Sequence, residues 1–173
     1  MTGVGKSWLA CALGDKACRE DFSVAYHRMP RLFSTLALAH GDGRYAKLLR
    51  ALSRVDLLIL DDWGSEVLNN EQRRDLLEIV EDRYNARSLL ITSQIPVNQW
   101  YDIIGNSTLA DAILDRIVHN AYRIELSGDS LRERIDDPIG SREDRQRPNA
   151  SAASQPPSSP ATPRHDARSL GEV

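Results

Sequence analysis

The side chains best suited to chemistry lie at the start of the chain, in the run Gly3-Val4-Gly5-Lys6-Ser7. A loop that cradles phosphates needs glycines, because backbone N–H groups must turn inward and approach the anion closely, and a lysine that reaches the outer phosphates. It also needs a Ser or Thr hydroxyl for magnesium and a helix whose N-terminus faces the anion. The apolar segment from Trp8 onward has a helical pattern. We therefore predict that residues 3–8 contact ATP and that Ser7 is a Mg2+ ligand.

The phosphate loop is incomplete in this chain. The full pattern has an earlier glycine five positions before Gly5, which would lie ahead of Met1. Met1 and Thr2 take the second and third positions of the loop. We expect that either the true start of the gene lies upstream and Met1 is a misassigned start, or the gene has decayed. The in-frame genomic sequence upstream of Met1 decides between the two.

A second motif supports the first. The run Leu57-Leu-Ile-Leu-Asp61-Asp62 places two acids after four apolar residues, as at the end of a strand buried on both faces of a parallel sheet. Ligands of open parallel sheets bind at this edge. We predict that Asp61 holds magnesium and that Asp62 orients or deprotonates an attacking water. Taken alone, the two acids could equally be a solvated pair at the end of a strand.

If the chain binds a nucleotide, three further polar side chains become candidates for the site. Gln94 ends the next apolar strand and could hold the water near the γ-phosphate, or simply end the strand. Arg116 lies on a predicted helix and could reach a neighbouring subunit's nucleotide, or pair with Asp111 or Asp115. Arg132 could sense the γ-phosphate within its own chain, or be a solvated charge.

The elements that must position these residues alternate between helix and strand. Buried apolar runs read as strands, and periodic amphipathic segments read as helices. Helices are predicted at residues 5–19, 30–40, 44–53, 70–86 and 108–120, and strands at 23–26, 55–62, 89–93 and 122–126. Such alternation favours an α/β fold with a parallel sheet covered by helices on both faces.

The composition changes near Asp136, which predicts two regions. Residues 1–135 contain the apolar runs, whereas residues 136–173 are rich in Pro, Ser, Ala and Arg. The second region has too few large apolar residues to offset its ordering entropy, so we predict a disordered tail. The net charge of −3 means that any nucleic-acid contact comes from a local patch or an assembly.

The chain shows no secretory signal and no apolar run long enough to cross a membrane. We therefore expect no membrane partner and a reduced, cytoplasmic location. The two cysteines, Cys11 and Cys18, are too few for a disulfide framework, and we expect them to be small buried apolar residues near one helix face.

Four segments together resemble the IstB-like ATP-binding proteins, which are related to the DnaC helicase loader and more distantly to DnaA. The segments are residues 2–7, 58–64, 90–96 and 110–121. The resemblance covers roughly residues 2–134, and residues 109–132 are its most family-specific part. It implies a three-layer P-loop NTPase of the AAA+ type. It further implies an ATPase that oligomerises on duplex DNA and assists a partner transposase, IstA.

The resemblance also implies roles for individual residues. Lys6 and its neighbours match the family's phosphate loop, and Asp61 and Asp62 match its Walker B acids. Arg116 matches the arginine finger and Arg132 the second sensor. Gln94 stands where relatives often carry a sensor asparagine.

The chain also departs from the family. Members have an N-terminal helical segment and a strand that leads into the phosphate loop, and neither precedes Gly3 here, which predicts an N-terminally truncated domain. Two alternatives therefore remain beside the transposition helper. One is a helicase loader of the DnaC type, which engages a replicative helicase through an N-terminal domain. The other is an inactive fragment of an ATPase.

Overall fold

Three parallel strands form the sheet, in the order β1-β2-β3. They are β1 (Val24–Arg28), β2 (Leu57–Trp63) and β3 (Ser88–Ser93). The register places Val24 beside Leu57, and Leu57 beside Ser88. The central strand is the most apolar because both its edges and both its faces are covered, and Leu58, Ile59 and Leu60 are at most 1% exposed. The computed structural model describes residues 3–119 and 121–128.

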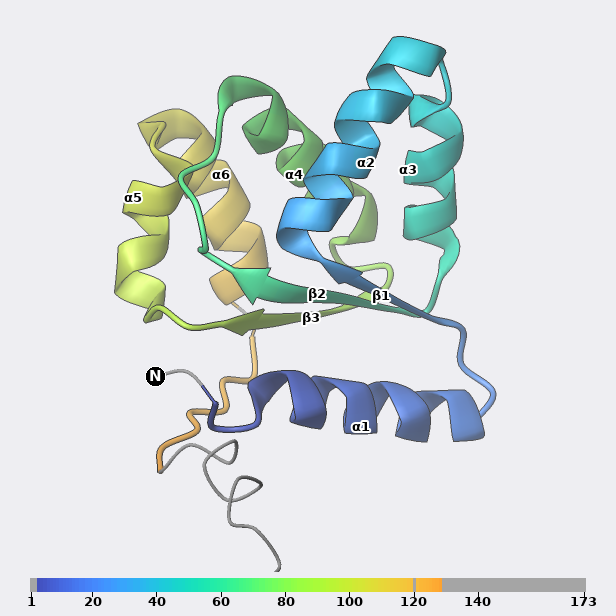
Figure 1. Cartoon of the computed structure of the whole chain (residues 1–173), viewed down its shortest axis with the longest axis vertical. Coiled ribbons are helices and arrows are strands. Elements are labelled where there is room, and N and C mark those ends of the chain that lie inside the picture. The colour runs from blue at the N-terminus through green and yellow to red at the C-terminus, as the bar shows by residue number, and fades with distance from the viewer. Residues whose placement is uncertain (1–2, 120, 129–173) are drawn as a thin grey trace, which may run out of the picture. The chain divides into compact units, whose positions relative to one another are not determined.

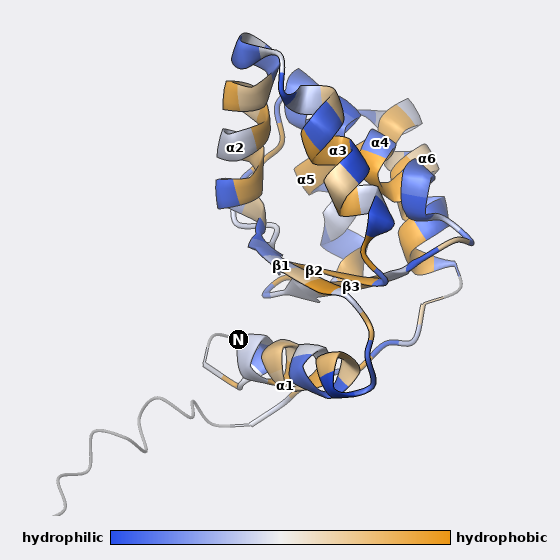
Figure 2. Ribbon diagram, turned by 90° about the vertical axis from the view of Figure 1, so that its right-hand side faces the viewer, coloured by the Kyte–Doolittle hydropathy of each residue, from blue (hydrophilic) through white to orange (hydrophobic). Residues whose placement is uncertain are grey.

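Helices connect the strands and follow the last one. They are α1 (Lys6–Arg19), α2 (Met29–Asp42), α3 (Tyr45–Arg54), α4 (Asn70–Arg83), the 3-10 turn η1 (Val97–Gln99), α5 (Trp100–Ile104) and α6 (Ser107–Val118). Helix α1 lies on one side of the sheet and the other helices lie on the opposite side (Figures 1 and 2). The predicted arrangement of a parallel sheet between two helical layers is confirmed.

Helix α1 approaches the sheet closely through two small residues. Ala10 and Gly14 are its buried positions. A Cβ atom on Gly14 would lie 2.9 Å from Cδ1 of Ile59 and 3.5 Å from Cγ1 of Val24, so a larger side chain would push α1 away from the strands. The close approach brings the N-terminus of α1 toward the end of β2, where the acids lie. The other face of α1 is exposed and carries Cys11 and Cys18, so the expectation that both cysteines are buried is wrong.

The larger core lies between the sheet and helices α2–α6. Leu36 of α2, Leu76 of α4 and Ile113 of α6 are completely buried in it. Trp63 at the end of β2 packs against Trp100 of α5, with ring centroids 5.2 Å apart. This packing fixes the end of β2, which is the end that carries the two acids.

One buried arginine joins the opposite end of the sheet to two helices. Arg83, the last residue of α4, is 2% exposed. Its guanidinium donates to the carbonyl oxygens of Leu52 at 2.6 Å and Val55 at 3.0 Å. It also donates to those of Asp56 at 3.2 Å and Ser88 at 2.5 Å. Arg83 thus holds the end of α3 against the starts of β2 and β3.

Three local predictions need correction. Residues 122–126 form no strand: Tyr122 is fully exposed and Ile124 is 66% exposed. A strand exists only through pairing, and in the described part of the chain the sheet consists of β1, β2 and β3. The helix predicted at residues 70–86 ends earlier, at Arg83, and it is capped by Asn69, whose side chain accepts from the Gln72 N–H in a capping box. Helix α5 was not predicted because five residues are too few to show a period.

Several predictions concern residues outside the described ranges. These are the start of the phosphate loop at Met1 and Thr2, the sensor role of Arg132, and the tail at residues 136–173. Within the described ranges, no helix is both long and apolar enough to span a membrane.

Candidate functional site

The phosphate-loop residues adopt the backbone conformation that the loop requires. Gly3 and Gly5 have φ angles of 85° and 89°, in the left-handed region that glycine enters without steric cost. Gly5 is the N-cap of α1, and its carbonyl accepts the first helical hydrogen bond from the Leu9 N–H at 2.9 Å. Lys6 therefore begins the helix, and the N–H groups of the first turn point out of the N-terminal end of α1. Such a helix start is a ready anion site.

The carboxylate of Asp61 is the centre of the site. It accepts hydrogen bonds from three hydroxyl groups that come from three different elements: Ser7 Oγ of α1, Tyr26 OH of β1 and Thr92 Oγ1 of β3. The Ser7 bond is 3.0 Å long and joins Oγ to Oδ1. The Tyr26 bond is 2.5 Å long and joins the phenol to Oδ2. The structure thus brings together Ser7 and Asp61, the two predicted magnesium ligands, which are 54 residues apart in the chain.

These hydroxyl groups favour the ionised form of Asp61. The residue is 1% exposed, and burial by itself raises the pKa of the carboxyl. Hydrogen bonds from Thr92, Tyr26 and Ser7, together with the charge of Arg28, outweigh burial and hold the pKa below its usual range. Burial and the bond to Asp61 raise the pKa of the Tyr26 phenol, so Tyr26 remains a donor at neutral pH.

Asp62 follows Asp61 directly but lies where the strand is irregular and makes different contacts. Asp62 has a φ of 68°, which is unusual for a residue other than glycine, and the pairing of β2 with β3 is irregular between Leu60 and Trp63. The Asp62 N–H donates to Thr92 Oγ1 at 3.2 Å. Its carboxylate accepts from Gln94 Nε2 at 2.9 Å. Asp62 and Gln94 are therefore held together, next to Asp61.

Two predicted site residues lie apart from this group. Trp8 follows Ser7 in the chain, and its side chain is 73% exposed on α1. Arg116 of α6 forms an ion pair with Glu81 of α4, at 3.0 Å between Nη2 and Oε1, and donates to the Ala112 carbonyl at 2.7 Å. Its guanidinium carbon also lies 6.0 Å from the centre of the Tyr84 ring. Within this chain, Arg116 is thus engaged with α4 and not with Asp61.

Three residues at the site were not predicted: Thr92 of β3, which bonds both acids, and a pair on β1. Tyr26 and Arg28 lie at the end of β1, and the register pairs Arg28 directly with Asp61. Arg28 Nε is 4.0 Å from Asp61 Oδ2, and its side chain is 65% exposed. The sequence does place a tyrosine and an arginine two residues apart at the end of a predicted strand, where site residues are expected. Only the register of β1 against β2 shows that they lie beside Asp61.

The oxygens gathered here fit a magnesium ion. Mg2+ prefers a small number of hard oxygen ligands, usually carboxylates, and keeps several waters. Ser7 Oγ and Asp61 Oδ1 are both hard oxygens and already adjoin each other at 3.0 Å. The ionised state of Asp61 supplies the negative charge that a cation needs.

Comparisons with known proteins agree with this geometry. Residues 1–137 match the model of the family described as IstB-like ATP binding protein. The chain is 71% identical over 131 residues to an insertion sequence ATP-binding protein of Sinorhizobium fredii, an alignment that covers 76% of this chain and 54% of the relative. It is 35% identical over 130 residues to the ATP-binding protein of insertion sequence IS21 of Pseudomonas aeruginosa, covering 75% and 49%.

A solved structure supports the same fold. The crystal structure of DnaI superposes with a TM-score of 0.66 at 25% identity, covering 73% of this chain and 69% of that one. The chain spans about half the length of the curated relatives it matches. The phosphate loop, the Asp61 strand and the family match agree, and the chain belongs to the family of IstB-like ATP-binding proteins.

Proposed function

We propose that this chain binds ATP with magnesium, hydrolyses it, and serves as a helper of DNA transposition that assembles on duplex DNA beside an IstA-type transposase. The observation that carries the proposal is the Asp61 carboxylate, ionised and buried, beside Ser7 Oγ at the N-terminus of α1. The names of the relatives, which are ATP-binding proteins of insertion sequences, support the biological setting. We place the ATP-binding domain at residues 1–135 and assign no role to the tail at 136–173.

The residues of the loop would bind the phosphates. The left-handed conformations of Gly3 and Gly5 turn backbone N–H groups toward an anion, and the N-terminus of α1 adds its partial positive charge. Val4 and Trp8 would contact the nucleotide through their backbone. Lys6 would neutralise the outer phosphates. Ser7 and Asp61 would hold the magnesium ion, which when bound neutralises the charge that develops on the transferred phosphate.

Asp62 and Gln94 would act on the attacking water. The bond from Gln94 Nε2 leaves the second oxygen of the Asp62 carboxylate available to accept a proton from water. Gln94 would therefore orient Asp62 as well as the water. The two carboxylates have different partners, Gln94 for Asp62 and hydroxyl groups for Asp61, and would have separate tasks.

Arg116 would complete the site of a neighbouring subunit in a homo-oligomer. To do so it must exchange its ion pair with Glu81 for the neighbour's phosphate. A partly exposed pair of this kind is worth about 1 kcal/mol, which is small beside a contact with a phosphate. Hydrolysis would then depend on assembly. Arg132, outside the described residues, would sense the γ-phosphate within its own chain.

Hydrolysis measurements test this proposal. We expect ATP hydrolysis that rises with protein concentration and with duplex DNA, and DNA binding that weakens steeply with salt. Asp62→Asn should bind ATP but not hydrolyse it, whereas the exposed control Glu66→Gln should behave as the wild type. Arg116→Ala should reduce hydrolysis without reducing ATP binding. An Asp62→Asn variant that hydrolyses ATP at the wild-type rate would overturn the assignment of Asp62.

Two alternatives to the transposition helper are tested separately. A helicase loader of the DnaC type shares this fold, as the likeness to the solved DnaC helicase loader indicates, but requires a replicative helicase as partner. Pull-down of the transposase encoded by the same element, with the replicative helicase as competitor, separates the two. An inactive fragment would bind no ATP analogue in a calorimetric titration, whereas micromolar binding would exclude it.

A further inference from the structure

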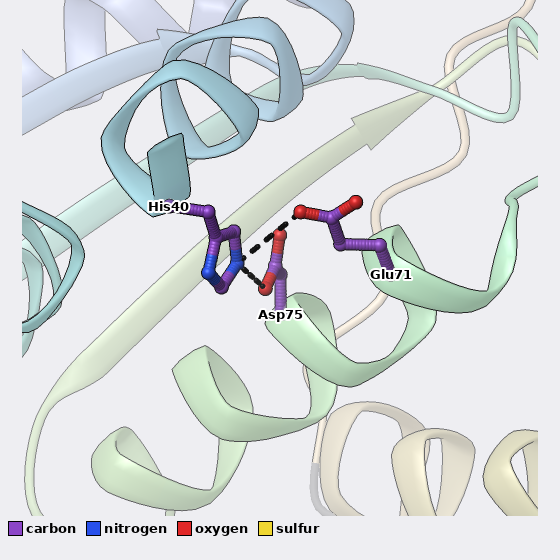
Figure 3. Close-up of side chains that lie close together, drawn as sticks. All are labelled: His40, Glu71 and Asp75. Atoms are coloured by element: carbon purple, nitrogen blue, oxygen red, sulfur yellow. Dashed lines mark hydrogen bonds and ion pairs between the residues drawn. The ribbon is translucent and has the colours of Figure 1, made fainter. Parts of the chain in front are cut away.

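A second cluster of ligating side chains lies between α2 and α4, apart from the strand ends that form the nucleotide site. His40 of α2 and Glu71 and Asp75 of α4 point toward one another (Figure 3). His40 Nε2 is 3.0 Å from Asp75 Oδ1 and 3.5 Å from Glu71 Oε1. The ligand atoms of the three residues all lie within 4.8 Å of one another. Three potential metal ligands thus converge from two helices.

The neighbouring residues fix this arrangement. Tyr45, the first residue of α3, stacks on the His40 ring with centroids 3.7 Å apart and planes at 21°. Its hydroxyl is 2.8 Å from Asp75 Oδ1 and 2.9 Å from Glu78 Oε2, so its single proton can satisfy one carboxylate at a time. Glu71 and Asp75 are four residues apart on α4 and therefore share one face of the helix. The His40 ring and the Asp75 carboxylate are held in place before any ligand arrives.

The charge of the cluster is poorly compensated. Asp75 is 3% exposed, and among the described residues its only basic partner within 4.0 Å is His40, at 3.0 Å. A buried carboxylate is costly unless it is paired with a cation. Glu71 and Glu78 add two more carboxylates beside it, and Arg74 is the one arginine among the residues that line the same pocket. A bound cation would supply the charge that the cluster lacks.

The spacing of the ligand atoms suits a tetrahedral zinc ion. Zinc binds imidazole nitrogen and carboxylate oxygen at about 2.0–2.2 Å, which places two tetrahedral ligands about 3.3 Å apart. The observed separations from His40 Nε2, 3.0 and 3.5 Å, lie on either side of that value. Glu71 has a side chain that is 54% exposed and can rotate to complete the triangle. A pocket lined by His40, Glu71 and Asp75 leaves the fourth position open to water.

We propose that His40, Glu71 and Asp75 form a zinc-binding site that joins α2 to α4. An imidazole with two carboxylates favours a borderline divalent ion of this kind over magnesium or calcium, which prefer oxygen ligands alone.

Zinc titration of the tag-free chain tests the site. The exposed thiols of Cys11 and Cys18 are competing zinc ligands, so the titration uses the double variant Cys11→Ser/Cys18→Ser, which alters only exposed positions of α1. After dialysis against a chelator, zinc is added in competition with a chromophoric chelator at neutral pH. We expect one zinc ion per chain in this background. Binding that disappears with the thiols would overturn the proposal.

Variants then locate the ion. His40→Gln and Glu71→Gln should each weaken zinc binding by at least about tenfold, because even the loss of residues that support a ligand has that effect. His119→Gln, at the exposed C-cap of α6, is the matched control and should bind as the parent does. Glu71 is exposed, so its variant keeps the test valid even if His40→Gln fails to fold. Unchanged affinity in Glu71→Gln, or equal loss in His119→Gln, would refute the assignment.

Discussion

The buried Arg83 offers the sharpest test of how the sheet is held in place. Arg83→Met keeps most of the aliphatic stem but removes the guanidinium that donates to four backbone carbonyls. Hydrogen bonds from a charged donor contribute roughly 1.5–3 kcal/mol each, and an unsatisfied buried acceptor costs roughly 1–3 kcal/mol. Asp56 lies near the surface, so water can replace its bond, whereas the carbonyl of Leu52 is bonded in a buried setting.

Removing the arginine also removes the free-energy cost of burying its charge. Burial lowers the pKa of Arg83, which shows that its charge is poorly solvated in the fold. Taking both effects together, we expect Arg83→Met to lower the free energy of unfolding by about 3–5 kcal/mol, the range for breaking a buried charged interaction by removing one partner. A domain of this size has a total stability of only about 5–15 kcal/mol. The loss should therefore be plain in a urea titration followed by circular dichroism.

Arg87 supplies the matched control. Its guanidinium pairs with Asp56 at 2.7 Å, but its side chain is 47% exposed, so Arg87→Met should cost less than about 1 kcal/mol. If Arg83→Met costs no more than Arg87→Met, the four carbonyl bonds do not hold the ends of β2 and β3, and the reasoning fails.

Three further predictions concern the nucleotide site. Because the pKa of Asp61 is lower in the folded state, ionised Asp61 stabilises the fold at every pH above the unfolded carboxyl pKa of about 3.9. This stabilisation is lost as the pH falls through the lower folded pKa. Asp61→Asn should therefore lack one step in the acid limb of a stability–pH profile; an unchanged limb would contradict this. Tyr26→Phe should raise the pKa of Asp61 and weaken magnesium-dependent ATP binding by roughly tenfold, the equivalent of one hydrogen bond to a charged group, measured by calorimetry. Gly5→Ala, at a φ of 89°, should cost roughly 1–2 kcal/mol of backbone strain and abolish ATP binding; wild-type affinity would exclude the left-handed loop.

The sequence predicted the elements whose signals are local. The apolar run before Asp61 identified the central strand, and the glycines before Lys6 identified the loop, because each pattern lies within a few adjacent residues. The pairing of Ser7 with Asp61 followed from the general rule that strand ends and loops meet at one edge of a parallel sheet.

The predictions that failed depend on tertiary partners. Residues 122–126 have the composition of a strand, but composition cannot supply a neighbouring strand with which to pair. Tyr26 and Arg28 reach Asp61 only through the register of β1 against β2, which no single segment encodes. Cys11 and Cys18 are exposed because α1 turns Ala10 and Gly14, not the thiols, toward the sheet.

The most direct test of the central claim is calorimetric titration of the purified chain with a non-hydrolysable ATP analogue, with and without magnesium. The wild type should bind the analogue in the micromolar range and more weakly without magnesium, because Ser7 and Asp61 then lose their ion. Lys6→Ala should abolish binding, whereas Lys16→Ala, two turns or more along the exposed face of α1, should not. Equal affinity of the wild type and Lys6→Ala for the analogue would contradict the account.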